Sequence, residues 1–114
     1  MSVFACARDR LVRLLRDGRS WTAETALEGA GARCVAAHDG RVLVGSRGRG
    51  ALLSVDWKAV ALPADSMPYA LVTTDGELLA GMSDGRILSS GDRGESWDEI
   101  GVRVGSILAM AAMP

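Results

Sequence analysis

Residues 37–46 read AHDGRVLVGS and residues 73–82 read TTDGELLAGM, so one pattern recurs after 36 residues. In both stretches an Asp-Gly pair divides two apolar runs. This arrangement is a strong signal for a β-hairpin, because a type I′ turn needs positive φ at both of its central residues. The two stretches therefore predict strands, and they predict that one structural unit is repeated.

The tryptophans extend this repeat over the chain. Trp21, Trp57 and Trp97 are separated by 36 and 40 residues, and the start of the chain aligns with residues 79–92 at an offset of 75. Three copies of about 38 residues account for the 114 residues.

Each copy is predicted to be a meander of short strands. The apolar runs are 33–37, 42–46, 51–55 and 57–61 in the second copy, and 69–74, 78–82, 86–89 and 97–100 in the third. Residues 8–16 show helical spacing of apolar side chains, but their alignment with residues 85–88 predicts a strand, because a repeated unit should not change type. The first copy begins at its second strand, residues 3–7.

The chain is therefore expected to be all-β, with three four-stranded repeats in a single domain, 1–114. The first comprises about 2–28 plus a C-terminal strand at 106–113, the second about 33–62, and the third about 69–102. The spare run at 106–112 is expected to pair beside the N-terminus of the same chain or of another subunit. Either pairing removes an exposed strand edge.

The most specific motif lies between the third and fourth strands of the third copy. Residues 90–97 read SGDRGESW and fit the pattern S-x-D-x-G-x-[ST]-W through Ser90, Asp92, Gly94, Ser96 and Trp97. An Asp side chain can accept backbone N–H bonds within its own turn, and Gly supplies a left-handed position. The earlier copies keep parts of this pattern, namely Asp17 with Trp21 and Asp56 with Trp57.

This motif, in phase with the repeat, resembles the Asp-box of the bacterial neuraminidase repeat (BNR) family, whose units are β-propeller blades. The resemblance implies a structural role for the motif at the rim away from the ligand face, with the tryptophans returning to the core. Three blades cannot close a ring, so we expect a homodimer with six blades. A monomeric β-trefoil and a piece of a larger propeller remain as alternatives.

The resemblance also bears on activity. Sialidases with such blades need three arginines, a Tyr–Glu pair and an acid, whereas this chain has one tyrosine, Tyr69, and no Glu that stands out as its partner. Carboxylates paired for glycoside hydrolysis are not identifiable from spacing either. We therefore expect a non-catalytic binding or scaffolding protein without a cofactor. A lectin is the alternative, and a hydrolase is less favoured.

A candidate ligand face follows from the propeller arrangement, where the loops between blades meet the turns between second and third strands. The residues expected there are Arg33, Arg47, Arg49, Asp65, Tyr69, Asp84 and Arg103. Converging arginines can hold carboxylate or phosphate groups through bidentate hydrogen bonds. The expected ligand is a small anion, a glycan or a peptide, unless the arginines are ordinary surface charges.

Composition argues against several other classes. The formal net charge is −1, which disfavours binding to nucleic acid or to an anionic membrane. No apolar run approaches the ~20 residues of a membrane-spanning helix. Cys6, Cys34 and His38 are too few and too scattered for a zinc site. No basic stretch precedes the first apolar run, so we expect no signal peptide and a cytoplasmic location.

Overall fold

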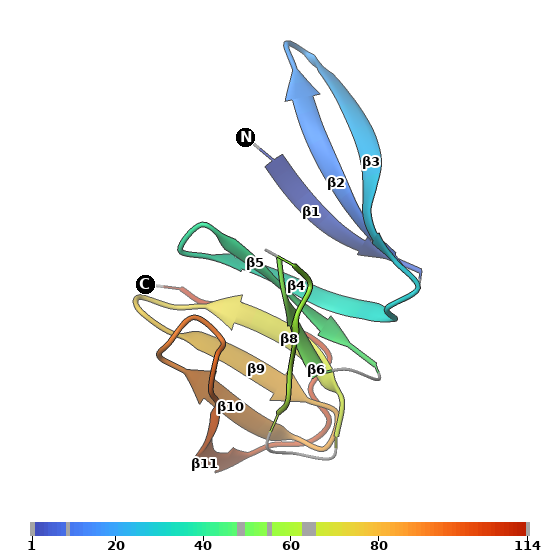
Figure 1. The fold of residues 1–114 in the computed structure, drawn as a ribbon. Coiled ribbons are helices and arrows are strands. Elements are labelled where there is room, and N and C mark those ends of the chain that lie inside the picture. The colour runs from blue at the N-terminus through green and yellow to red at the C-terminus, as the bar shows by residue number, and fades with distance from the viewer. Residues whose placement is uncertain (1, 9, 48–49, 55, 63–65, 114) are drawn as a thin grey trace.

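The computed structural model describes residues 2–8, 10–47, 50–54, 56–62 and 66–113. Within these ranges all regular secondary structure is β-strand, and the strands form three antiparallel sheets (Figure 1). The all-β prediction is therefore confirmed. The same ranges contain no helix that is long and apolar enough to cross a membrane.

The first sheet has three strands, and the second and third sheets have four each. The first sheet comprises β1 (Ser2–Ala7), β2 (Arg10–Asp17) and β3 (Ser20–Glu28). The second comprises β4 (Ala32–His38), β5 (Arg41–Ser46), β6 (Gly50–Leu53) and β7 (Ala59–Val60). The third comprises β8 (Pro68–Thr73), β9 (Leu78–Met82), β10 (Arg86–Ser90) and β11 (Asp98–Arg103). Strands that follow one another in sequence are neighbours in each sheet, as a meander requires.

The stretch with helical spacing forms the strand β2, as its alignment predicted. Its apolar residues follow one another because both faces of the first sheet are apolar. Leu11 is fully buried against the second sheet, whereas the next residue, Val12, pairs with Ala5 on the opposite face. Consecutive apolar residues therefore do not distinguish a helix from a strand in a sheet of this kind.

The two Asp-Gly turns differ in length. Between β4 and β5 the turn has two residues, and Asp39 and Gly40 have φ of 52° and 76°, as a type I′ turn requires. Between β8 and β9 the last pair is Thr73 with Leu78, so the loop has four residues, of which only Gly76 has positive φ. The type I′ prediction is thus confirmed at the first turn and wrong at the second.

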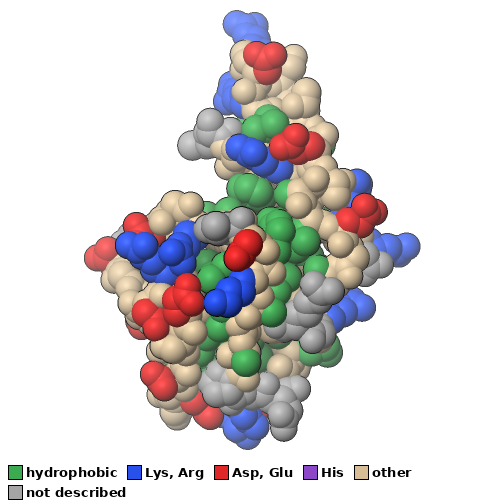
Figure 2. Space-filling view, viewed as in Figure 1, with side chains coloured by type: hydrophobic (Ala, Val, Ile, Leu, Met, Phe, Trp, Pro, Cys, Tyr) green, Lys and Arg blue, Asp and Glu red, His purple; other side chains and the backbone are tan. Residues whose placement is uncertain are grey.

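The three sheets stack in chain order, with the second between the first and the third (Figure 1). Leu11, Val44 and Leu52 are fully buried between the first and second sheets. A larger cluster that includes Leu43 and Leu78 fills the space between the second and third sheets. Each fully buried leucine contributes about 1.5–3 kcal/mol to stability. Figure 2 shows hydrophobic side chains gathered where the projecting first sheet meets the rest of the molecule.

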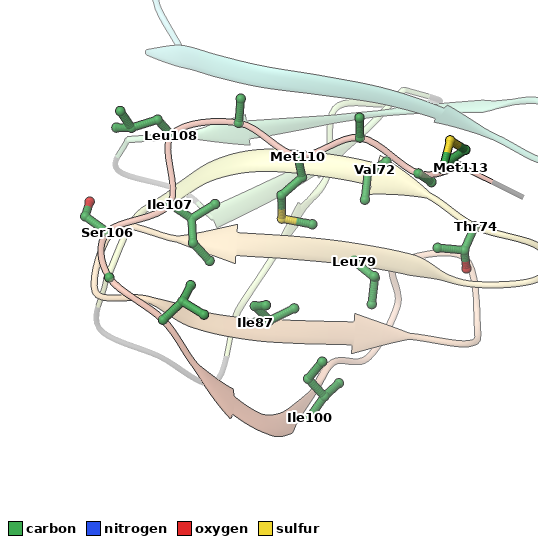
Figure 3. A pocket seen from close by; sticks show the side chains of 15 residues that line it. Val72, Thr74, Leu79, Ile87, Ile100, Ser106, Ile107, Leu108, Met110 and Met113 are labelled. Atoms are coloured by element: carbon green, nitrogen blue, oxygen red, sulfur yellow. The ribbon is translucent and has the colours of Figure 1, made fainter.

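The predicted C-terminal strand is not formed. The segment after β11 has no strand pairing and crosses the face of the third sheet that is turned away from the second sheet (Figure 3). Its pairing with the first sheet of the same chain is not observed, because the second sheet separates the first sheet from the third (Figure 1).

The three tryptophans occupy different environments. Trp97 is 6% exposed within the larger cluster, and Trp57 is partly buried against the smaller one. Trp21 is 49% exposed, so the expectation that every tryptophan returns to the core is wrong there. The β2–β3 hairpin is tight, and it places Trp21 opposite Arg16, whose guanidinium lies 5.6 Å from the ring centroid.

Candidate anion-binding site

A cleft of about 710 Å³ opens where strand ends from all three sheets meet. Its charged and aromatic lining consists of Arg8, Arg33, Arg47 and Tyr69. No carboxylate occurs among the described residues that line it. Three guanidinium groups and a phenol make this cleft a candidate site for an anion.

The strand order brings these side chains together. Arg33 and Tyr69 are each the second residue of a strand, β4 and β8, whereas Arg8 and Arg47 directly follow β1 and β5. Because β4 and β5 are antiparallel, the start of one lies beside the end of the other. The N–H of Arg47 donates to the carbonyl of Gly31 at 3.1 Å and fixes this corner of the second sheet.

Arg33 is held over an aromatic ring. Its guanidinium carbon lies 4.7 Å from the centroid of Tyr69, within the range of a cation–π contact worth about 0.5–1 kcal/mol at an exposed position. Neither Arg8, Arg33 nor Arg47 forms an ion pair with a described carboxylate. The stacking therefore orients the guanidinium of Arg33 and leaves its N–H groups available to a ligand.

Two thiols lie beside the cleft. Burial raises the pKa of Cys34 to about 12, with a further contribution from nearby Cys6, and burial also raises the pKa of Cys6. Arg33 opposes both shifts without reversing them. Because the thiolate is the nucleophile in cysteine chemistry, thiols that stay protonated do not support a catalytic role.

The structure brings together only part of the predicted ligand face. Arg33, Arg47 and Tyr69 line the cleft, whereas Arg49 and Asp65 lie outside the described residues. Asp84 and Arg103 belong to a separate group of charges on the third sheet, where Asp84 pairs with Arg86 at 3.0 Å and Arg103 with Glu99 at 3.8 Å.

The pKa of Asp84 reflects that group of charges. Desolvation opposes its ionisation, but the backbone N–H of Arg86 and the guanidinium groups of Arg86 and Arg103 hold its pKa below the usual range. Asp84 and Arg103 therefore satisfy their charges locally, away from the cleft.

Arg8 was not among the predicted site residues, although the repeat contains the signal for it. Arg8, Arg47 and Ser83 occupy equivalent positions, each directly after the second strand of its copy. The hydrogen bond from Arg47 to Gly31 recurs as one from the N–H of Ser83 to the carbonyl of Met67, at 2.8 Å. Because Arg47 was predicted to face the ligand, the equivalent Arg8 could have been predicted as well.

The Ser90–Trp97 loop is a closed hydrogen-bonded unit. Oδ1 of Asp92 accepts from the Ser90 hydroxyl at 2.8 Å and from the Ser96 N–H at 2.9 Å, and Oδ2 accepts from the Ser96 hydroxyl. These bonds, those of Ser96 above all, lower the pKa of Asp92 to about 2. The Trp97 ring N–H donates to the Gly94 carbonyl at 3.0 Å, which ties the loop to the core.

The same loop contacts the β4–β5 turn of the second sheet. Arg93 pairs with Asp39 at 2.7 Å, and Glu95 pairs with Arg41 at 3.2 Å. Both pairs are solvent-exposed, so each contributes about 0–1 kcal/mol. The hydrogen bonds of Asp92 close its own loop, and the two ion pairs join that loop to the second sheet, which favours a structural role for the loop.

The two partial motifs form fewer hydrogen bonds than the Ser90–Trp97 loop. Asp17 pairs with Ser20 across the two-residue turn between β2 and β3. Oδ1 of Asp56 accepts the N–H of Lys58 at 3.1 Å, and Trp57 has a φ of 52°. The network around Asp92 does not recur in the described parts of either motif.

Among the described residues, no group of three or more His, Cys, Asp or Glu side chains is placed to hold a metal ion. Comparison of the chain with models of known families, with curated proteins and with solved structures finds no match.

Proposed function

We propose that this chain is a non-catalytic binding module built from β-propeller blades, and that its cleft binds a carboxylate or phosphate group of a small ligand. The main observation behind this proposal is the convergence of Arg8, Arg33 and Arg47 beside Tyr69 in one polar cleft. Guanidinium groups offer paired N–H donors that match the oxygen spacing of both anions. The propeller assignment is supported by the meander sheets, by their stacking in chain order, and by the resemblance of residues 90–97 to an Asp-box.

The lining supports binding rather than catalysis. No described carboxylate lines the cleft to act as an acid or base, and the pKa values of Cys6 and Cys34 are both raised. One face of Tyr69 is occupied by Arg33, so little aromatic surface remains for stacking on a sugar ring. An anion bound by hydrogen bonds and charge fits this set of groups best.

A thermal-shift screen at constant ionic strength tests the proposal. Citrate, succinate, pyrophosphate and inorganic phosphate are the probes, with chloride and neutral monosaccharides for comparison. A ligand present at about 100 times its Kd stabilises the native state by about 2.7 kcal/mol, which raises Tm by several degrees. A shift with neutral sugars alone would favour a lectin, and no shift with any anion would contradict the proposal.

Matched variants locate the site. Arg33→Gln should weaken binding of the best anion about 10- to 100-fold, because a hydrogen bond to a charged group is worth about 1.5–3 kcal/mol. Arg19→Gln removes the same charge from the β2–β3 turn, outside the cleft, and should leave the Kd unchanged. Equal losses in the two variants would indicate general charge attraction and would overturn the assignment to the cleft.

A further inference from the structure

The outer face of the third sheet has apolar residues at the positions whose equivalents in the second sheet pack between two sheets. Val72, Leu79 and Ile87 on this face correspond, at the 36-residue spacing, to Ala36, Leu43 and Ala51 of the second sheet. Leu43 and Ala51 are fully buried beneath the third sheet, and Ala36 packs against the same cluster. The outer face of the third sheet is therefore built to receive another sheet.

The C-terminal segment, residues 104–113, already lies where the first strand of such a sheet belongs. A Cβ placed on Gly45 would lie 3.2 Å from Pro68, the first residue of β8, and a Cβ on the equivalent Gly81 would lie 2.6 Å from Ile107. Figure 3 shows Ile107 and Met110 directed toward the third sheet. The segment thus repeats the position of β8 one sheet further on, with Ile107 in the place of Pro68.

The edges of this segment are open. Its backbone hydrogen bonds among the described residues run from Val104 to Gly85 and from Ile107 to Met82, and no strand pairs with it. A groove of about 780 Å³ lies between it and the third sheet, lined mainly by apolar side chains such as Leu79 and Ile87. The segment fills the position of a first strand, and among the described residues no further strand lies beside it.

The first sheet has an open edge at β1, where a first strand would pair. At the offset of 75, β1 corresponds to β9, the second strand of the third sheet, and not to β8. The strand β9 is paired on both sides, whereas β1 is paired only with β2 among the described residues. Within the described ranges, the first sheet therefore has the equivalents of a second, third and fourth strand, and no strand occupies the position of a first one.

The uncovered face of the first sheet also matches a buried one. Val3 and Ala5 correspond to Leu78 and Ala80, which are both fully buried against the second sheet. Val3 itself is 41% exposed. Like the outer face of the third sheet, this face has residues that are typical of a contact between sheets, but no sheet of the described chain covers it.

We propose that the open C-terminal segment of one copy of this chain and the open edge of β1 in a second copy pair with each other. The C-terminal segment of one copy pairs, antiparallel, with β1 of the second copy, and the first sheet of the second copy then covers the third sheet of the first. The register that β8 and β9 share places Ala109 opposite Cys6 and Met110 opposite Ala5. Two such junctions, related by a two-fold axis, use every open face and close a ring of six sheets. This assembly does not depend on the proposed anion site.

The mass in solution is the first test, measured without ligand by size-exclusion chromatography with light scattering over a dilution series. The expected value at high concentration is about twice 11.9 kDa. Ala5→Glu places a charge on the face to be covered and should shift the protein to the monomer. Thr22→Glu is the control, because it lies on β3, which corresponds to β11, a strand with every residue exposed. A single-chain mass at all concentrations, or a dimer in Ala5→Glu, overturns the proposal.

A cross-link tests the register itself. Directly opposed residues of antiparallel strands have Cα atoms about 4.5–5.5 Å apart, within disulfide range. Ala109→Cys should therefore form an intermolecular disulfide with Cys6 on mild oxidation, visible as a dimer on a non-reducing gel and as a linked peptide by mass spectrometry. Ala112→Cys places the thiol three residues along and on the other face, and should not cross-link to Cys6. Cross-linking in both variants or in neither overturns the register.

Discussion

Asp92 illustrates how one exposed side chain can organise a whole turn. Its two oxygens accept hydrogen bonds from both sides of the loop, from Ser90 and from Ser96. Because these donors favour the charged form, they lower the pKa of the carboxyl from 3.8 to about 2. The turn is therefore held by an ionised group, and its stability depends on pH.

The sign of this dependence follows from linkage. The pKa of Asp92 is lower in the folded state than its ordinary value of 3.8, so its contribution to stability is present above pH 3.8 and is lost as the pH falls through about 2. Asp92→Asn should be less stable than the parent at neutral pH, and the difference should shrink over this acid interval. Urea unfolding midpoints measured across the interval check this expectation. Asp98→Asn, on exposed β11, should follow the parent curve. A constant difference between Asp92→Asn and the parent would contradict it.

Individual site residues were predictable where the repeat fixes a strand end. Arg33 and Tyr69 are second residues of equivalent strands, so their convergence followed from the alignment. The environment of Trp21 was not predictable in the same way, because the shorter β2–β3 turn moves the ring toward solvent. The ionic partners of Asp84 and Arg103 depend on side-chain directions within the third sheet, which spacing alone does not give.

At the scale of the element, the Ser90–Trp97 loop depends on one glycine. Gly94 has a φ of 90°, and a Cβ at this position would overlap the side chain of Leu43 in the second sheet. The loop can therefore approach the core only because this residue has no side chain. Both the backbone conformation and the contact between sheets restrict position 94 to glycine.

A pair of glycine variants separates this requirement from a general effect of substitution. Gly94→Ala should lower the free energy of unfolding by about 2–4 kcal/mol, from the left-handed backbone penalty together with overpacking of the core. Gly91→Ala lies in the same loop, but its Cβ would meet nothing within 4 Å. It should change stability by no more than about 0.5 kcal/mol. Chemical denaturation of both variants measures the difference, and equal losses would show that Gly94 is not specifically required.

The strands were more predictable from the sequence than the segments at their ends. The order of the strands in each sheet was predictable, because apolar runs and turn residues recur in every copy. The residues after β11 form an apolar run that was predicted to be a strand, but no strand lies beside them in the described chain. Pairing needs a partner edge as well as a suitable sequence, so strand propensity alone cannot decide it.

At the scale of the whole molecule, stability is expected to be uneven. The second sheet is covered on both faces, whereas the first sheet contacts the rest on one face only and projects from it (Figure 1). Most residues of β3 are exposed, in contrast to the buried residues of β5 and β9. In an isolated chain, the first sheet would therefore open locally more often than the other two.

Hydrogen exchange followed as a function of protein concentration distinguishes this isolated chain from the proposed ring. In the ring the edge of β1 is paired, so its amides should exchange as slowly as those of β9. Dilution to the monomer should accelerate exchange in β1 and in residues 106–112 together, because each supplies the hydrogen-bond partners of the other. The amides of β9 are paired within one chain and should respond little. The β3 amides that point away from β2 should exchange rapidly at every concentration, because β3 stays at the sheet edge. Fast exchange in β1 at all concentrations would mean that no strand is added to this edge, and protection of β1 without residues 106–112 would mean that a different segment occupies it.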